Sequence, residues 1–334
     1  MIDGNIGSAM IEPRKRSVKE VGSVQISLLL MQEIVKLFVI MLMGYAVVKA
    51  GLMKASDSRS ISVVLVYLVI PCVIIHAFQV DCTPDVQRGL ILAAIAAAAI
   101  HVLFLAITVP LKKLLHLDVI EQATCIYSNA GILVIPLVQA LLGEEYVIYS
   151  SAFIAVQLIL LWTHGKNLLC GESHLEWKRV LLNVNILSIL VGICLFLLQI
   201  RLPAGVQDVL GMMNNMIGPL GMLLAGMAIA ETSLKSVFLR KRSYLTVVLR
   251  LIVYPLLALL LIKGIFPASN AGVSDADSIL LTVYLAAITP ACATITSMAQ
   301  LYECDAAYSS SLYVLTTILA IVTMPLMVFL YEVI

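Results

Sequence analysis

Two apolar stretches of this chain, residues 121–142 and 278–300, carry hydrogen-bonding side chains and a proline near their centres. The candidate ligand-binding residues are Asn129, Gly131 and Pro136 in the first stretch, and Thr289, Pro290, Thr294 and Thr296 in the second. Amide and hydroxyl groups donate hydrogen bonds to a bound molecule. Proline lacks a backbone N–H and its ring clashes with the carbonyl four residues earlier, so each proline also frees a main-chain carbonyl. This pattern predicts the binding of a small polar molecule rather than covalent chemistry.

The sequence contains no signature of an enzyme or a metal site. The H-E-x-x-H, G-x-S-x-G and P-loop strings are absent. The seven cysteines form no C-x-x-C pair and most lie in apolar runs, which is typical of cysteine acting as a small apolar residue. An intramembrane enzyme would need metal ligands, or a nucleophile and a base, close together at one depth in the membrane. The five histidines are spread over different apolar runs and loops, which argues against such an enzyme. We therefore expect no enzymatic activity, no cofactor and no metal.

The composition places these stretches in a lipid bilayer. Of the 334 residues, 61% are hydrophobic and 12% are charged, whereas soluble domains average about 45–50% apolar and about 25% charged residues. The formal net charge of +1 gives no indication of a nucleic-acid partner. A bilayer-spanning helix needs about 20 apolar residues. The predicted spans are residues 30–49, 60–79, 89–110, 121–142, 145–165, 181–200, 207–230, 243–265, 278–300 and 308–331.

The distribution of positive charge predicts the domain organisation and orientation. We expect a disordered tail (residues 1–27), five helices (28–167), a short cytoplasmic linker (168–180) and five more helices (181–334). The loops after spans 1, 3, 5 and 7 hold twelve Lys and Arg residues, whereas the loops after spans 2, 4, 6 and 8 hold three. By the positive-inside rule the first set is cytoplasmic, so both termini of this plasma-membrane protein are predicted to be extracytoplasmic.

The two halves of the chain echo each other. The segments GEEYVIYSSAF (143–153) and ECDAAYSSSLY (303–313) share Tyr-Ser-Ser at an offset of 159 positions. Because each half holds an odd number of spans, two such copies lie in opposite membrane orientations, as in the inverted repeats of secondary transporters. Paired, proline-interrupted spans in corresponding positions point to a transporter's binding site. We therefore expect spans 4 and 9 to be broken at their prolines and to meet within the membrane.

Three segments resemble the auxin efflux carrier family, which includes bacterial malonate-type carriers and plant PIN auxin exporters. They are SNAGILVIPLVQALLG (128–143), GPLGMLLAGMAIAE (218–231) and ITPACATITSMAQLYECDAAYSSSLYVLTTILAIVTMPL (288–326). The resemblance implies an all-α fold of ten transmembrane helices in two inverted five-helix repeats, like bile-acid symporters and sodium/proton antiporters, with crossing broken helices 4 and 9. It also implies export of a small organic carboxylate by an elevator-type cycle, and a homodimer.

The resemblance carries the family's asparagine to Asn129 and its crossover prolines to Pro136 and Pro290. A second asparagine near Pro290 is absent here, and threonines stand there instead. Asn129 and the backbone N–H groups that follow each break would bind the carboxylate, and the threonine hydroxyls would complete the site. The structural alternatives are an interhelical hydrogen bond for Asn129 and bonds to the local helix backbone for the threonines.

The coupling ion is left open by the sequence. The centres of spans 4 and 9 contain no Asp or Glu, so His76 and His101 are the candidates for proton coupling, with a structural hydrogen bond as the alternative for each. Without a coupling ion, the membrane potential alone could drive anion export, since one charge gains about 2.3 kcal/mol per 100 mV. Arg250, in span 8, is predicted to extend its side chain to the cytoplasmic edge.

Two other functions are compatible with the same pattern. One is a sodium-coupled organic-anion symporter of the bile-acid type, which the sodium dependence of uptake would distinguish. The other is a membrane receptor or scaffold that transports nothing. A receptor has no need of two mid-membrane interruptions in corresponding positions, which is why a transporter is preferred.

Overall fold

The computed structural model describes residues 23–171, 182–231, 234–266, 273 and 275–334. The predicted disordered tail falls mostly outside these residues, but helix α1 already begins at Ser23, so the last five residues of that tail are helical. The predicted linker is also partly helical, because α8 continues to Cys170. Its remaining residues lie almost wholly outside the described part of the chain.

Within the described residues, all regular secondary structure is helical apart from one isolated bridge. The α-helices of the first half are α1 (Ser23–Lys49), α2 (Ser58–Val64), α3 (Ile70–Ala77), α4 (Pro84–Leu115), α5 (Val119–Ile126), α6 (Ile135–Leu141), α7 (Val147–Leu160) and α8 (Lys166–Cys170). Those of the second half are α10 (Val184–Leu197), α11 (Ala204–Glu231), α12 (Leu234–Leu239), α13 (Lys241–Val248), α14 (Tyr254–Ile265), α15 (Ala276–Ile288), α16 (Ala293–Leu301) and α17 (Ala306–Val333).

A helix overlaps each of the ten apolar runs. In the part of the chain that the structure describes, seven continuous helical segments are long and apolar enough to cross a membrane. Three further apolar helices are shorter, namely Ala130–Leu141, Val184–Leu197 and Ala276–Ile288. The chain is therefore a multi-pass membrane protein. Helix α4 is longer than predicted: it includes Lys112 and Lys113, which had been placed in a loop, because positive side chains are favourable in the last turn of a helix.

Prolines account for most of the irregular turns inside the spans. Four π-helical turns are present in the described residues: η3 (Leu65–Val69), η4 (Ala130–Val134), η6 (Leu161–Gly165) and η7 (Leu249–Val253). Pro71, Pro136 and Pro255 each follow such a turn by two residues. Since a proline cannot donate to the carbonyl four residues earlier, the preceding turn widens.

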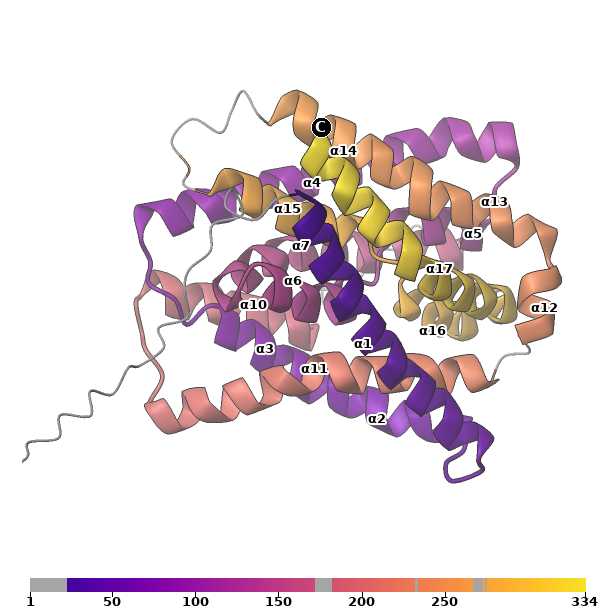
Figure 1. Ribbon diagram of the computed structural model, residues 1–334, viewed down its shortest axis with the longest axis horizontal. Coiled ribbons are helices and arrows are strands. Elements are labelled where there is room, and N and C mark those ends of the chain that lie inside the picture. The colour runs from indigo at the N-terminus through magenta and orange to yellow at the C-terminus, as the bar shows by residue number, and fades with distance from the viewer. Residues whose placement is uncertain (1–22, 172–181, 232–233, 267–272, 274) are drawn as a thin grey trace, which may run out of the picture.

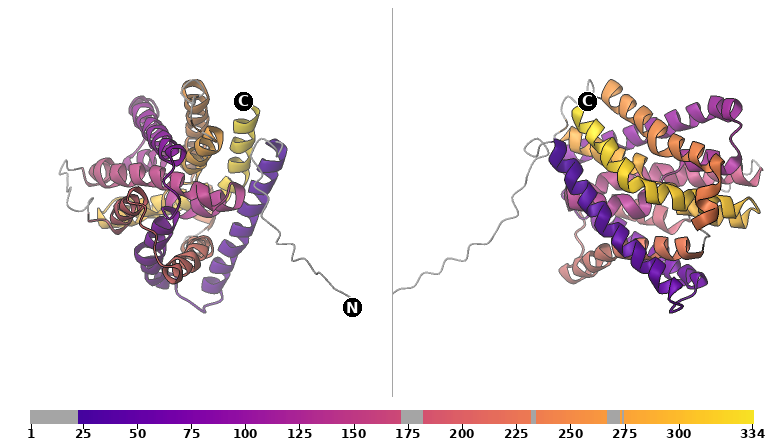
Figure 2. Two further views of the ribbon diagram at one scale, coloured as in Figure 1. Left: turned by 90° about the vertical axis from the view of Figure 1, so that its left-hand side faces the viewer. Right: turned by 45° about the vertical axis from the view of Figure 1, so that its right-hand side comes forward.

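Helices α1 and α11 make the closest backbone contact of the fold. In Figure 1, α1 crosses the front of the molecule and meets α11 along the lower edge. A Cβ atom on Gly226 would lie 1.9 Å from the Met41 carbonyl oxygen, and one on Gly44 would lie 2.3 Å from the Leu223 carbonyl oxygen. Glycine at both positions lets the two backbones touch, as small residues do where membrane helices pack closely. In both views of Figure 2, α1 also lies beside α17.

Replacing Gly226 with alanine should therefore separate α1 from α11. We expect a loss of about 1–3 kcal/mol, because rigid backbone atoms rather than flexible side chains oppose the added methyl group. The matched control is Gly205→Ala in the same helix, where a Cβ meets no atom within 4 Å. That substitution should be neutral or slightly stabilising. Thermal unfolding in detergent measures both, and equal melting temperatures for the two variants would contradict the close contact.

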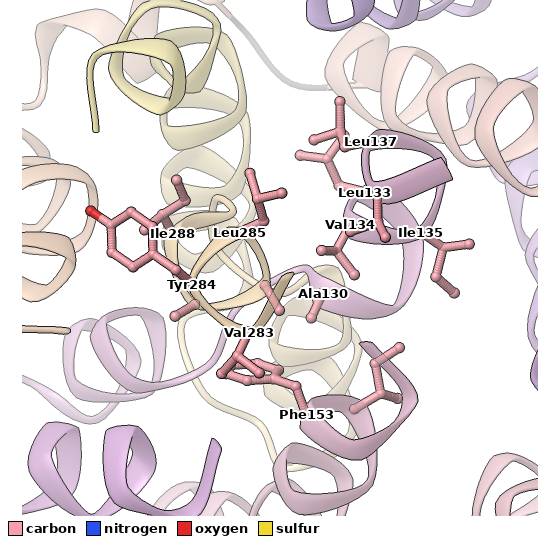
Figure 3. Close-up of a cluster of buried hydrophobic side chains, with 14 of the residues drawn as sticks. Ala130, Leu133, Val134, Ile135, Leu137, Phe153, Val283, Tyr284, Leu285 and Ile288 are labelled. Atoms are coloured by element: carbon pink, nitrogen blue, oxygen red, sulfur yellow. The ribbon is translucent and has the colours of Figure 1, made fainter. Parts of the chain in front are cut away.

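Helix α15 lies at the centre of the protein, and every one of its residues except Asp277 is buried. Figure 3 shows side chains of α15 facing those of the second half of span 4, with Phe153 of α7 beside them. The labelled residues of this apolar cluster are Ala130, Leu133, Val134, Ile135, Leu137, Phe153, Val283, Tyr284, Leu285 and Ile288. This packing fixes the position of η4 and α6 against α15, and thereby the position of the two interruptions described next.

Candidate functional site

Spans 4 and 9 are both interrupted. Helix α5 ends at Ile126, Tyr127 is extended, and the helix resumes at Ala130. Helix α15 ends at Ile288, and α16 begins at Ala293 after a short extended segment. The expectation of two broken spans is therefore confirmed. The break in span 4, however, does not lie at its proline as predicted: Pro136 follows it by seven residues, within the first turn of α6.

The two interruptions touch each other, and we call residues 127–129 and 289–292 together the crossing. Ser128 and Ala291 form an isolated antiparallel β-bridge. The Asn129 N–H donates to the Pro290 carbonyl at 2.9 Å, and the Cys292 N–H donates to the Tyr127 carbonyl at 3.2 Å. Main-chain groups that would be costly to leave free in a membrane are thus paired with each other.

One side chain from each following span holds the crossing in place. Gln157 of α7 accepts hydrogen bonds from the Ser128 N–H at 3.0 Å and from its hydroxyl at 2.6 Å, and donates to the Ser128 carbonyl at 2.8 Å. Thr316 of α17 accepts a bond from the Ala291 N–H at 3.2 Å. Neither residue was recognised in the sequence. They lie 159 positions apart, the same offset as the repeated Tyr-Ser-Ser, so this offset could have identified the pair.

Removing the Gln157 amide should loosen the first interruption. In Gln157→Leu the buried Ser128 N–H and carbonyl lose their partners, and each unsatisfied group costs about 1–3 kcal/mol. We expect a clear fall in stability and a rise in hydrogen exchange at residues 127–129. The control is Gln87→Leu, an exposed glutamine on α4, which should stay within about 0.5 kcal/mol of wild type. Unchanged exchange in Gln157→Leu would show that Gln157 does not hold the crossing.

Arg250 is the charged group of the crossing, and its predicted position was wrong. Instead of reaching the membrane edge, the side chain is completely buried. Its guanidinium donates to the carbonyls of Cys125 at 3.1 Å, Ala287 at 2.8 Å and Thr289 at 3.2 Å. The carbonyls of Cys125 and Ala287 belong to the last turns of α5 and α15, where helix carbonyls lack intrahelical partners, and Thr289 is the residue that follows α15. The carbonyls thus replace the water that would otherwise draw Arg250 to the surface.

The electrostatics of the crossing are positive. Four helix ends meet there, two C-terminal ends with partial negative charge and two N-terminal ends with partial positive charge. Arg250 is bonded to both C-terminal ends, while the N-terminal ends of helix Ala130–Leu141 and of α16 have no compensating acid in the described residues. Among these residues no carboxylate forms an ion pair with Arg250. The site therefore favours an anion.

Asn129 and Gly131 offer a place for that anion. Asn129 is 4% exposed, and its side-chain amide makes no hydrogen bond to the described residues. A Cβ on Gly131 would meet no atom within 4 Å, so open space lies beside the start of η4. An unpaired amide, free helix N–H groups and open space are the requirements for binding a carboxylate.

The threonines of span 9 are used differently from one another. The buried Thr289 hydroxyl donates to the Ala286 carbonyl at 3.0 Å, which satisfies the carbonyl that Pro290 frees. The Thr296 hydroxyl bonds the Ser309 hydroxyl at 3.0 Å. Thr294, in the first turn of α16, remains half-buried. The hydroxyls of Thr289 and Thr296 are thus used for hydrogen bonds within the protein in this conformation, and Thr294 stays a candidate ligand.

Two cavities lie beyond the crossing, toward the end of span 4. The larger, of 420 Å³, is lined by α1, α6 and α11 and by Glu144, and it includes Pro136. The smaller, of 260 Å³, is lined by α3, α6, η5 (Glu144–Tyr146) and α11 and includes His76. Asn129 lines neither of them. His101 is completely buried in α4, where its Nδ1 lies 2.8 Å from the Ala97 carbonyl oxygen and its ring packs on Phe153.

A buried ion pair anchors the start of α5. Glu121 is 1% exposed, and its carboxylate accepts from Arg242 at 2.7 Å and from the Tyr308 hydroxyl at 2.8 Å. Asp118 caps α5 by accepting from the Glu121 N–H at 2.8 Å, and burial raises the pKa of the Asp118 carboxyl above its ordinary value. Because the Glu121 oxygens are fully paired, this acid acts as a structural tie between α5, α13 and α17.

The comparisons with known proteins agree with this geometry. A family model described as a membrane transport protein matches residues 29–176 and 173–328. Among curated proteins, none matches the chain. The family match covers nearly the whole sequence, and its members are transporters rather than enzymes. The chain therefore belongs to the membrane transport protein family of auxin efflux carriers, as its resemblance to that family had predicted.

Proposed function

We propose that the protein is a secondary transporter that carries a small organic carboxylate anion across the plasma membrane, in the direction of export. The observation that carries this proposal is the crossing itself. Among the described residues, it combines a buried guanidinium that has no carboxylate partner, two helix N-termini without a compensating acid and an unpaired amide on Asn129. A net positive charge buried in a membrane is costly, and a bound carboxylate would neutralise it.

The architecture belongs to the same proposal. We infer ten transmembrane helices in two inverted five-helix repeats, with both termini extracytoplasmic. The matched positions of Gln157 and Thr316 support this, because each holds the interrupted span that precedes it. Movement of the crossing relative to α1 and α11 would give alternating access. The contacts at Gly218 and Gly221 of α11, against Pro136 and Ile132, are where such movement would occur.

Arg250 weighs against a sodium-coupled symporter. In transporters with broken helices, the C-terminal half-helix ends and unwound carbonyls coordinate the coupling cation. Here the guanidinium already bonds the corresponding carbonyls of Cys125, Ala287 and Thr289. A cation at this place would lose those oxygens as ligands and would lie next to a positive charge.

Efflux from proteoliposomes tests the proposal. The purified protein is reconstituted and loaded in turn with radiolabelled malonate, succinate and acetate, with sodium or choline as the only added cation. We expect efflux of at least one carboxylate at equal rates in sodium and choline, slowed at least tenfold in Asn129→Ala (about 1.4 kcal/mol). Sodium-dependent flux would favour the bile-acid type of symporter. Binding without flux would favour a receptor, and neither binding nor flux would reject the proposal.

A further inference from the structure

The smaller cavity contains polar groups that neither the fold nor the crossing uses. Asn214 of α11 lines both cavities and is only 3% exposed, yet its side-chain oxygen has no hydrogen-bond partner among the described residues. The side-chain nitrogen of Gln79, which lines the smaller cavity two residues after the end of α3, is likewise buried and unpaired among the described residues. Buried polar atoms are nearly always hydrogen-bonded, so an unpaired acceptor in a cavity wall indicates an absent ligand.

The charge of the smaller cavity defines the kind of ligand. Glu144 and Glu145 of η5 line it, and none of its described lining residues is a lysine or an arginine. The larger cavity adds Glu33 and Lys36, which already form an ion pair with each other at 2.7 Å. An anion entering the smaller cavity would meet two carboxylates without a compensating positive charge. A cation with N–H groups could instead donate to the Asn214 oxygen and to the carboxylates.

We propose that the smaller cavity is a binding site for a small organic ammonium ion. Asn214 accepts one N–H at the buried end of the cavity, and Glu144 and Glu145 supply the opposite charge at the other. The volume of 260 Å³ suits a molecule of a few heavy atoms. Among the described residues no group of three His, Cys, Asp or Glu side chains is placed to hold a metal ion, which favours an organic cation over a metal.

Occupancy of this site would also affect transport, a consequence that rests on the proposed function. The smaller cavity lies between α3 and α11 on one side and α6 and η5 on the other. Helix α6 continues from the crossing, so it must move if the crossing moves. An ammonium ion bonded to Asn214 of α11 and to Glu144 of η5 would tie the two sides together and slow carboxylate efflux.

Isothermal titration of the full-length protein in detergent tests the site. The probes are ethanolammonium chloride, which has N–H donors, and choline chloride, which has the same charge but no N–H. We expect ethanolammonium to bind at least tenfold more tightly than choline, as a hydrogen bond to a charged group would give. Equal affinity for the two cations, or no detectable binding of ethanolammonium at about 10 mM, would overturn the proposal.

Matched variants locate the bound cation. Asn214→Leu should weaken ethanolammonium about tenfold, whereas Asn215→Leu, which lines only the larger cavity, should not. Asn214→Asp should tighten binding. The double variant Glu144→Gln/Glu145→Gln should also weaken ethanolammonium binding. Both residues are exposed, so this variant can be tested even if Asn214→Leu does not fold. Retained affinity in that double variant would overturn the proposal.

The two proposals fail separately. Asn129→Ala should leave ethanolammonium binding unchanged, and Glu144→Gln/Glu145→Gln should leave carboxylate binding unchanged. If ethanolammonium binds but no carboxylate is transported, the cavity site stands and the transport proposal falls. If carboxylate efflux proceeds at the same rate with bound ethanolammonium, the link between the cavity and transport is wrong.

Discussion

Arg250→Met is expected to destabilise the protein by about 3–5 kcal/mol and to abolish carboxylate binding. The substitution removes every donor from the carbonyls of Cys125, Ala287 and Thr289, which are buried within the membrane. It also removes the positive charge that attracts the anion. In Arg250→Lys the ammonium can reach only some of these carbonyls, so both the stability and the carboxylate affinity of this variant should fall between those of wild type and Arg250→Met.

The matched control is Arg240→Met. Arg240 is exposed and contacts Asp305 at 3.5 Å, so its loss should cost less than about 1 kcal/mol and should leave binding intact. Chemical denaturation and carboxylate titration of the three variants decide the result. Wild-type stability together with wild-type affinity in Arg250→Met would show that the crossing does not depend on this guanidinium.

Asn129→Ala is expected to weaken carboxylate binding about 10- to 100-fold while leaving stability nearly unchanged. The two effects separate because the Asn129 amide has no partner among the described residues, so its removal breaks no bond of the empty protein. An interhelical hydrogen bond, the alternative considered from the sequence, would give the opposite result, with lost stability and little change in affinity. Asn129→Asp should bind still more weakly, because two carboxylates would repel each other.

A suitable control is Asn185→Ala in α10. Asn185 is also buried with an unpaired side-chain oxygen, but it lies outside the crossing. Its replacement should not affect carboxylate affinity. A thermal-shift titration with the transported carboxylate compares the two variants. Equal affinity in wild type and Asn129→Ala would remove Asn129 from the site.

The spans could be located from the sequence because bilayer thickness fixes their length. All ten apolar runs correspond to helices, and the two polar, proline-containing runs are the interrupted ones. The position of the first break could not be predicted from Pro136 alone. A proline disturbs the turn before it, here η4, whereas the non-helical segment at Tyr127–Asn129 is stabilised by its hydrogen bonds to residues 290 and 292 and by Gln157. Those contacts come from residues distant in the sequence.

The role of Arg250 was hidden for a related reason. An arginine seven residues inside a predicted span is compatible with a side chain that reaches the membrane edge. Burial is favourable only when several acceptors converge, and the carbonyls of Cys125 and Thr289 converge only once spans 4 and 9 are broken and in contact. The role of the Thr289 hydroxyl could not be predicted from the sequence for the same reason, because the carbonyl to which it donates is exposed only by the break itself.

Cryo-electron microscopy with the transported carboxylate bound tests the central claim most directly. The account predicts density for the carboxylate within hydrogen-bonding distance of the Asn129 amide, beside Gly131 and the first N–H groups of the helix that begins at Ala130. It also predicts Arg250 in contact with the ends of α5 and α15. Carboxylate density elsewhere in the protein, or unbroken helices through residues 127–129 and 289–292, would contradict it.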